Sequence, residues 1–260
     1  MNNNRQALLL VTHRLNDSLI EKLHVLKSAF EPYGDTFFVY QKDSEYLSEK
    51  DIQKLDALNA VGFTIEDLCT LGYEALEETI IPGSNHFITM WFWKQYPGYS
   101  HYWNVEYDVE FAGDWRELFS ALAESNADFI ATRMERYKDN PYWYWWPAFK
   151  SIGGYVPYRE RVKSFNPIYR LSDRAFSHLD LRFRTGWGGH HEVTIPTILD
   201  RDGFKIEDIG ACGAFTPEER RGMFYDADVP DPLGTMRHAP VFKRDEIVPD
   251  SHMLYHPVKD

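Results

Sequence analysis

Two strand patterns separated by a helix pattern open this chain and restrict the folds available to it. Ala7–Thr12 is apolar up to its last residue, as in a strand buried on both faces of a parallel sheet. Asn16 or Asp17 can then cap a helix with its leucines on one face, and Thr36–Tyr40 reads as a second strand. A strand, a helix and a strand within about forty residues predict a right-handed βαβ unit.

The same alternation continues to about residue 132. Strands are expected at 60–63, 102–105 and 128–132, and helices at 86–96 and 115–125. Beyond that point we expect a strand at 166–170, helices at 173–179 and 195–200, the second capped by Thr194, a short strand at 205–209 and a flexible loop at 186–189. Strands alternating with helices predict an α/β sheet with nucleotide-binding topology.

Charge and cysteine usage limit the partners and the compartment. Lys and Arg total 28 and Asp and Glu total 40, so the net charge is −12, which argues against binding nucleic acid or an anionic membrane. The two cysteines are far apart and fit a reducing compartment. No signal core and no transmembrane run is evident, so a cytoplasmic protein is expected.

Two carboxylates close the expected strand at 102–105. Glu106 and Asp108 are spaced i and i+2, so they can point to the same side just past the strand end. Grouped oxygen ligands suit a hard divalent cation, and such a cation suits a phosphate at the carboxyl end of a sheet. On spacing alone, two solvated acids explain the pattern equally well.

A second polar group follows the loop at 186–189. Three consecutive ligands, His190-His191-Glu192, cannot readily all face one metal ion. A structural role, with a histidine stacked on Trp187 and Glu192 paired with an arginine, and a catalytic role for Glu192 both remain open. For the aromatic run Tyr142–Trp146, core packing is favoured over stacking on a sugar.

Taken in order, these features resemble a GT-A-type glycosyltransferase of the bacterial, inverting type. The resemblance rests on Thr12-His13-Arg14, the βαβ start, Glu106-Tyr107-Asp108 and Trp187–Glu192. It implies one GT-A-like (Rossmann-like) domain over residues 1–260, with a mixed sheet flanked by helices. Residues 1–132 would form its nucleotide-binding half and residues 133–260 its acceptor half.

The resemblance also implies a set of site residues. Asp108 and Glu106 would hold Mn²⁺ or Mg²⁺, although glutamate replaces the usual first aspartate, and Glu192 would be the base that deprotonates the acceptor. His256 would add a metal or diphosphate ligand, with His238 and His252 as competing candidates, although composition alone favours a solvated tail for it. Residues expected to contact the nucleotide are Thr12, His13, Arg14, Asp43, Asn85 and Lys259; for Asn85, helix capping is an equal alternative.

The function implied is transfer of a sugar from a nucleotide diphosphate donor to a hydroxyl acceptor, with inversion. A UDP-sugar is the candidate donor, and a surface glycan or its lipid-linked precursor is the candidate acceptor, as in polysaccharide biosynthesis. Two alternatives remain. A sugar-nucleotide nucleotidyltransferase usually has a Gly-rich loop after the first strand, where this chain has Thr12-His13-Arg14. A non-catalytic carbohydrate-binding protein on a transferase-like fold fits the aromatic content.

Overall fold

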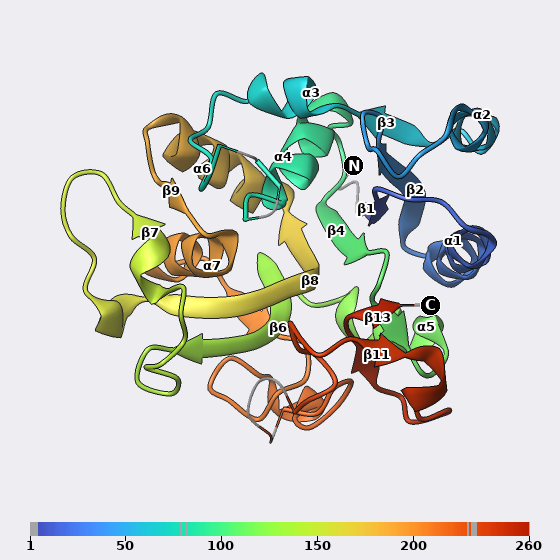
Figure 1. Ribbon diagram of the computed structural model, residues 1–260. Coiled ribbons are helices and arrows are strands. Elements are labelled where there is room, and N and C mark those ends of the chain that lie inside the picture. Colours follow the sequence, from blue (N-terminus) through green and yellow to red (C-terminus); the bar gives the residue numbers. More distant parts are fainter. Residues whose placement is uncertain (1–4, 79, 82, 228, 230–232, 260) are drawn as a thin grey trace.

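A seven-stranded mixed sheet forms the centre of the molecule (Figure 1). The computed structural model describes residues 5–78, 80–81, 83–227, 229 and 233–259. The sheet has the order β10-β6-β8-β4-β1-β2-β3, and β8 is antiparallel to both of its neighbours. Its strands are β1 Gln6–Thr12, β2 Gly34–Gln41, β3 Val61–Phe63, β4 His101–Glu106, β6 Phe129–Arg136, β8 Val162–Ser172 and β10 Ile206–Asp208. The predicted α/β class, with a mixed sheet flanked by helices, is confirmed.

Helices cover both faces of this sheet. They are α1 Asp17–Phe30, α2 Glu49–Ala57, α3 Ile65–Cys69, α4 His86–Gln95, α5 Trp115–Leu122, α6 Asp173–Arg184 and α7 His191–Arg201. Short 3₁₀ turns occur at Trp146–Ala148, Tyr158–Glu160, Glu218–Arg220 and Arg244–Glu246. No helix among these described residues combines the length and the apolar character that crossing a membrane requires.

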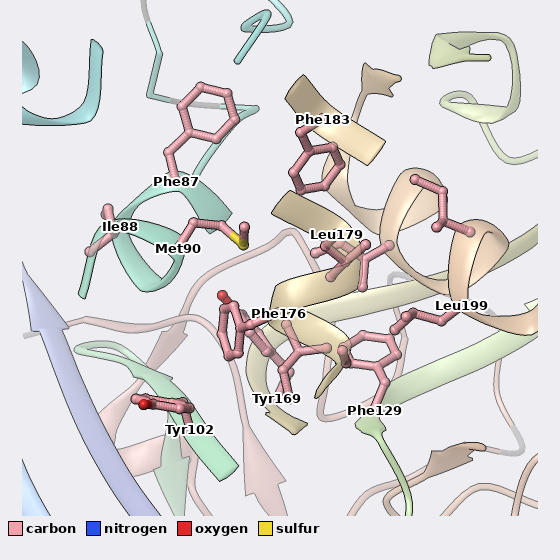
Figure 2. Packing of buried hydrophobic residues seen from close by; sticks show 14 of the residues in the cluster. Phe87, Ile88, Met90, Tyr102, Phe129, Tyr169, Phe176, Leu179, Phe183 and Leu199 are labelled. Atoms are coloured by element: carbon pink, nitrogen blue, oxygen red, sulfur yellow. The ribbon is translucent and has the colours of Figure 1, made fainter. Parts of the chain in front are cut away.

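Alternate residues of β1 divide the core into two layers. Ala7 and Leu9 belong to the cluster that α4, α6 and α7 cover, whereas Leu8 and Leu10 belong to the cluster that α1 and α5 cover. This division follows from the two-residue period of a strand. Figure 2 shows the first cluster, with side chains of α4, α6 and α7 packed over those of the sheet.

Three two-stranded ladders tie the remaining segments to the body. β5 (Glu110–Phe111) pairs with β12 (Leu254–Tyr255), β11 (Phe242–Lys243) with β13 (Val258–Lys259), and β7 (Phe149–Lys150) with β9 (Gly188–Gly189). The C-terminal segment is therefore packed, and Leu254 is fully buried. The alternative of a solvated tail is wrong, because the pairing partners of this segment lie far away in the sequence.

Two local expectations around residue 190 are also wrong. The helix begins at His191 rather than near 195, and the Thr194 hydroxyl donates to Gly188 O instead of capping it. Pro196 lies inside the helix, where it cannot bond Glu192 O, and that carbonyl accepts from the Ser164 hydroxyl instead. The expected flexible loop contains β9, in which a Cβ on Gly189 would lie 1.7 Å from Ala148 O.

Candidate functional site

Two adjoining cavities open at the carboxyl ends of β1, β2 and β4. The smaller has a volume of about 220 Å³ and is lined by Val11, Thr12, His13, Gln41, Phe63, Ile81, Asn85, Ile88, Asn104, Glu106, Tyr107 and Asp108. The larger has a volume of about 580 Å³, and its lining includes Trp143, Tyr144, Trp145, Asn166, His190, His191, Glu192, His238, His256 and Lys259. Asn85, Glu106 and Asp108 line both cavities, so these three residues mark the junction.

Glu106, Asp108 and His256 meet at this junction, and we call them the acidic cluster. Each offers one ligand atom, and these atoms lie within 4.8 Å of one another. His256 Nε2 is 3.7 Å from a Glu106 oxygen and 3.5 Å from Asp108 Oδ1. Glu106 ends β4, Asp108 lies in the next turn, and His256 follows β12. The pairing of β12 with β5 thus brings the C-terminal histidine to the acids.

The acidic cluster fits a divalent cation. Asp108 Oδ1 is buried, and within the described part of the chain it has no hydrogen-bond partner. The other ring nitrogen of His256, Nδ1, is 2.8 Å from the carbonyl of Arg237, an acceptor that makes Nδ1 the donor and leaves Nε2 facing the acids. Two carboxylates and one imidazole are ligands that Mn²⁺ accepts, and carboxylates also suit Mg²⁺.

The charges of the cluster favour a bound cation. Burial raises the pKa of Asp108, against the attraction of His256. Burial alone would lower the pKa of His256, but the nearby negative carboxylates of Glu106 and Asp108 outweigh burial and raise it. The cluster therefore stabilises positive charge next to its carboxylates, whether a proton on the ring or a metal ion.

Asn85 joins this cluster from the start of α4. Its backbone is at the N-cap position, but its side chain makes no capping hydrogen bond. Instead, Nδ2 donates to Glu106 Oε1 at 3.4 Å, and Oδ1 is buried without a partner among the described residues. The capping alternative is therefore wrong for this side chain, which faces the junction.

The residues after β1 build one wall of the smaller cavity. The Thr12 hydroxyl donates to Arg14 O at 2.7 Å and accepts from Arg14 N at 3.1 Å, which fixes the turn. His13 lines the cavity and packs edge-on against Tyr107 at 4.9 Å. The Arg14 guanidinium lies 4.9 Å from the Tyr107 ring centre and lines neither cavity.

Of the last two residues expected to contact the nucleotide, only Lys259 lines a cavity, and Asp43 does not. Asp43 lines neither cavity, and its carboxylate accepts from Ile65 N at 3.0 Å, at the start of α3. Lys259 is exposed on β13 and lines the larger cavity. Its positive charge contributes to lowering the pKa of His13, after burial and Arg14.

Glu192 faces the larger cavity from the first turn of α7. Its Oε1 accepts from Asn166 N at 3.2 Å, and its Oε2 is 3.8 Å from His190 Nδ1. The side chain is 12% exposed, so it is held in place yet still reached from the cavity. His190 stacks on Trp145 at 4.4 Å, whereas the structural alternative places a histidine on Trp187.

Three buried histidines line or back this part of the cavity, and we call His86, His190 and His191 the histidine cluster. The His86 and His191 rings stack at 5.6 Å. Burial lowers the pKa of His86 to about 3 and that of His190 to about 4, and it lowers the pKa of His191 well below its usual value. At neutral pH these rings are therefore uncharged.

Sequence reasoning missed the contribution of several cavity residues. Asn166 and Trp145 are placed only by tertiary packing, and the sequence indicates no role for His86 beyond its position at the start of the helix expected at 86–96. For the aromatic run Tyr142–Trp146, core packing and a place in the cavity each hold for different residues. Trp146 is buried in the core, Trp145 lines the cavity, and Tyr142 is 94% exposed.

Comparison with known proteins gives a family and a set of structural relatives. A family described as "Protein of unknown function (DUF3405)" matches residues 61–190, half of the chain. No curated protein matches. Similar solved structures include a mycobacterial protein with 13% identity and a TM-score of 0.43, covering 80% of this chain and 66% of that one.

Two further solved structures are similar to this chain. S. aureus TarS 1–349 is 14% identical with a TM-score of 0.36, covering 68% of this chain and 50% of that one. Mannosyl-3-phosphoglycerate synthase from Rubrobacter xylanophilus is 8% identical with a TM-score of 0.40, covering 78% of this chain and 64% of that one. The chain thus spans about half to two thirds of the length of these structures.

Proposed function

We propose that this chain, which belongs to the family described as "Protein of unknown function (DUF3405)", transfers a sugar from a nucleoside diphosphate donor to a hydroxyl acceptor. The proposal rests on the chemistry of its site. One observation carries the proposal. The acidic cluster lies at the junction of two cavities, and Asn85, Glu106 and Asp108 line both. A diphosphate at this point would place the nucleoside in the smaller cavity and the reacting sugar in the larger one.

The donor side is supported by position and charge. Nucleotides bind at the carboxyl ends of strands in open α/β sheets, where the smaller cavity opens. Thr12, His13 and Asn85 line that cavity, and Lys259 lines the adjoining larger cavity. Arg14 and Asp43 would act indirectly, through Tyr107 and the start of α3. A UDP-sugar is the donor we propose to test first.

Asp108, Glu106 and His256 would hold Mn²⁺ or Mg²⁺. Such an ion, when bound, neutralises the charge of a diphosphate leaving group. Lys259 would add a second positive charge on the same side of the larger cavity. The exposed position of this lysine leaves its ammonium group available to a ligand.

The acceptor side is supported by Glu192 and the aromatic wall. Glu192 is the base in this proposal, because its carboxylate lines the larger cavity and Asn166 N fixes its orientation. A base that takes the proton of the attacking hydroxyl implies one displacement with inversion at the anomeric carbon. Trp143 and Trp145 provide the rings on which a glycan or lipid-linked sugar acceptor would pack.

Calorimetric titration with UDP tests the donor side. We expect wild-type protein to bind UDP with Mn²⁺ and to lose that binding in EDTA. Asp108→Asn should lose it in both conditions, whereas Asp245→Asn, which removes an exposed acid, should behave as wild type. UDP affinity that is independent of Mn²⁺ in all three proteins rejects the proposal. Metal-dependent binding without any sugar transfer or donor hydrolysis favours the carbohydrate-binding alternative.

A further inference from the structure

Lys22 is a buried lysine whose ammonium group reaches the turn that carries Asp108. It lies on α1 and is 7% exposed. Its Nζ donates to the carbonyl of Tyr107 at 3.0 Å and to the carbonyl of Val109, and it lies 3.7 Å from Glu110 Oε1. The two carbonyls flank Asp108 in the sequence, so the Lys22 side chain bonds the turn on both sides of this acid.

The carbonyl between these two is fixed from the opposite direction. Asp108 O accepts from Val258 N at 2.9 Å, a donor supplied by β13. Three successive carbonyls of the turn are therefore each held by a donor from a distant element, α1 or β13. Such a turn has little freedom to rotate, which fixes the direction in which the Asp108 carboxylate leaves the backbone.

Lys22 is also linked to the other end of the acidic cluster. Its counter-ion Glu110 begins β5 and stands opposite Tyr255 of β12, the residue immediately before His256. Arg244, near the C-terminal segment, lies 3.6 Å from the same Glu110 oxygen and donates to the Ser18 hydroxyl of α1. One polar cluster, made of Lys22, Glu110, Arg244 and Ser18, thus connects the segments that carry Asp108 and His256.

Stability alone explains this lysine poorly. Removing an ammonium group from water costs several kcal/mol, and a buried ion pair is often no more stabilising than apolar residues of similar volume. What an apolar side chain could not supply is the pair of hydrogen bonds to the turn.

We propose that Lys22 is a positioning residue that sets the geometry of the cation site formed by Glu106, Asp108 and His256. This inference rests on the proposed function, since it assigns Lys22 to the cation site of that proposal. Groups that orient metal ligands typically change metal affinity by about 10–100-fold when they are removed.

Mn²⁺ affinity of the nucleotide-free protein is the decisive measurement, read by electron paramagnetic resonance. Lys22→Met should raise the Kd for Mn²⁺ by about 10–100-fold. The matched control is Lys27→Met, which removes an exposed lysine of the same helix and should keep the wild-type Kd. A merely structural Lys22 would lower the thermal midpoint and leave the Kd of the folded protein unchanged, and that result overturns the proposal.

A metal-free readout and a second variant cover the case in which Lys22→Met folds poorly. Hydrogen exchange at the Val258 amide should be faster in Lys22→Met than in Lys27→Met, because that amide donates to Asp108 O, in the turn that Lys22 bonds. Glu110→Gln keeps Lys22 but removes its counter-ion, and it should weaken Mn²⁺ binding by a smaller factor. Wild-type Kd in Glu110→Gln, together with unchanged Val258 exchange in Lys22→Met, also overturns the proposal.

The outcomes separate this inference from the function on which it rests. If Asp108→Asn abolishes Mn²⁺ binding while Lys22→Met leaves it intact, the cation site stands and only the role of Lys22 is rejected. If wild-type protein binds no Mn²⁺ at all, the cation site fails, and the role of Lys22 fails with it.

Discussion

The acidic cluster and the histidine cluster both contain buried histidines, yet their electrostatics are opposite. His256 is 7% exposed and His86 is 3% exposed, so burial is similar. Next to Glu106 and Asp108, the pKa of His256 is raised. Among aromatic and other histidine rings, burial lowers the pKa of His86 to about 3. The neighbours of a buried histidine, rather than burial itself, decide whether it carries charge.

In the proposed function, this difference gives the two sides of the larger cavity separate tasks. Among the residues that the structure describes, only Glu106, Asp108 and His256 group as ligands for a metal ion. The histidine cluster stays neutral and packs around the segment that carries Glu192. In the proposed reaction, the acidic cluster would hold the leaving diphosphate and the neutral side would hold the acceptor and its base.

Replacement of Glu192 should have the largest effect. Glu192→Gln keeps the size of the side chain but removes the base, so kcat should fall by about 10²–10⁴-fold while Mn²⁺ and UDP affinities stay unchanged. Glu77→Gln, at an exposed acid lining the same cavity, serves as the control and should turn over normally. A parallel fall in thermal midpoint and nucleotide affinity, or a product with retained anomeric configuration, contradicts the role of Glu192.

Replacement of single histidines tests the comparison directly. His256→Ala should raise the Kd for Mn²⁺ by at least about tenfold, because it removes one of three grouped ligands. His190→Ala should leave that Kd unchanged, since its ring lies among aromatic side chains. Metal titration followed by calorimetry compares the two. Equal weakening in both variants would show that the clusters do not act separately.

The pH dependence of stability gives a third test. The folded pKa of His86 is about 3, below the ordinary value of 6.5, so below pH 6.5 the unfolded chain binds more protons than the folded protein. Stability from this neutral ring is present above pH 6.5 and is lost as the pH falls. Between pH 7 and pH 5, the loss is about 2 kcal/mol.

Denaturant unfolding at these two pH values checks the expectation. In His86→Leu, the decrease in the free energy of unfolding from pH 7 to pH 5 should be smaller than in wild type by about 2 kcal/mol. His24→Leu removes an exposed histidine of α1 and should leave the decrease unchanged. The same pH dependence in His86→Leu as in wild type would place the acid-sensitive groups elsewhere.

Local sequence signals predicted most of the elements and one half of the site. Asn16 accepts from Leu19 N at the start of α1, as its place before the helix pattern predicted, and Thr64 and Asp67 form a capping box at α3. The pairing of Glu106 with Asp108 at the end of β4 followed from their i and i+2 spacing, although Asp108 itself lies in the turn after the strand. These features depend on neighbours within a few residues, which a sequence displays.

The other half of the site depends on contacts between distant segments. His256 was suggested by family resemblance, but β5 and β12 bring it to Asp108 across more than a hundred residues. The hydrogen bonds of Lys22 join α1 to the turn after β4 in the same way. Asp43 follows a strand end as expected, yet it bonds Ile65 N instead of lining a cavity. No pattern of neighbouring residues shows which of these side chains reach the site and which do not.

The smallest expected effect concerns the aromatic wall beside the histidine cluster. Trp145 lines the larger cavity, and the His190 ring stacks on it at 4.4 Å, which fixes its plane. Stacking on an aromatic ring contributes about 0.5–1.5 kcal/mol, so Trp145→Ala should raise the KM for the acceptor by about 2–12-fold. Because Trp145 contributes no ligand to the acidic cluster, kcat and the Mn²⁺ Kd should stay near wild type.

Tyr142 provides the matched control for Trp145, since it belongs to the same aromatic run, is 94% exposed and lines neither cavity. Tyr142→Ala should leave the acceptor KM unchanged in steady-state assays with saturating donor. If both variants behave alike, the wall does not bind the acceptor, and the neutral side of the cavity serves only to hold Glu192. If Trp145→Ala instead weakens Mn²⁺ binding, the two sides are coupled, and the contrast between the clusters does not extend to function.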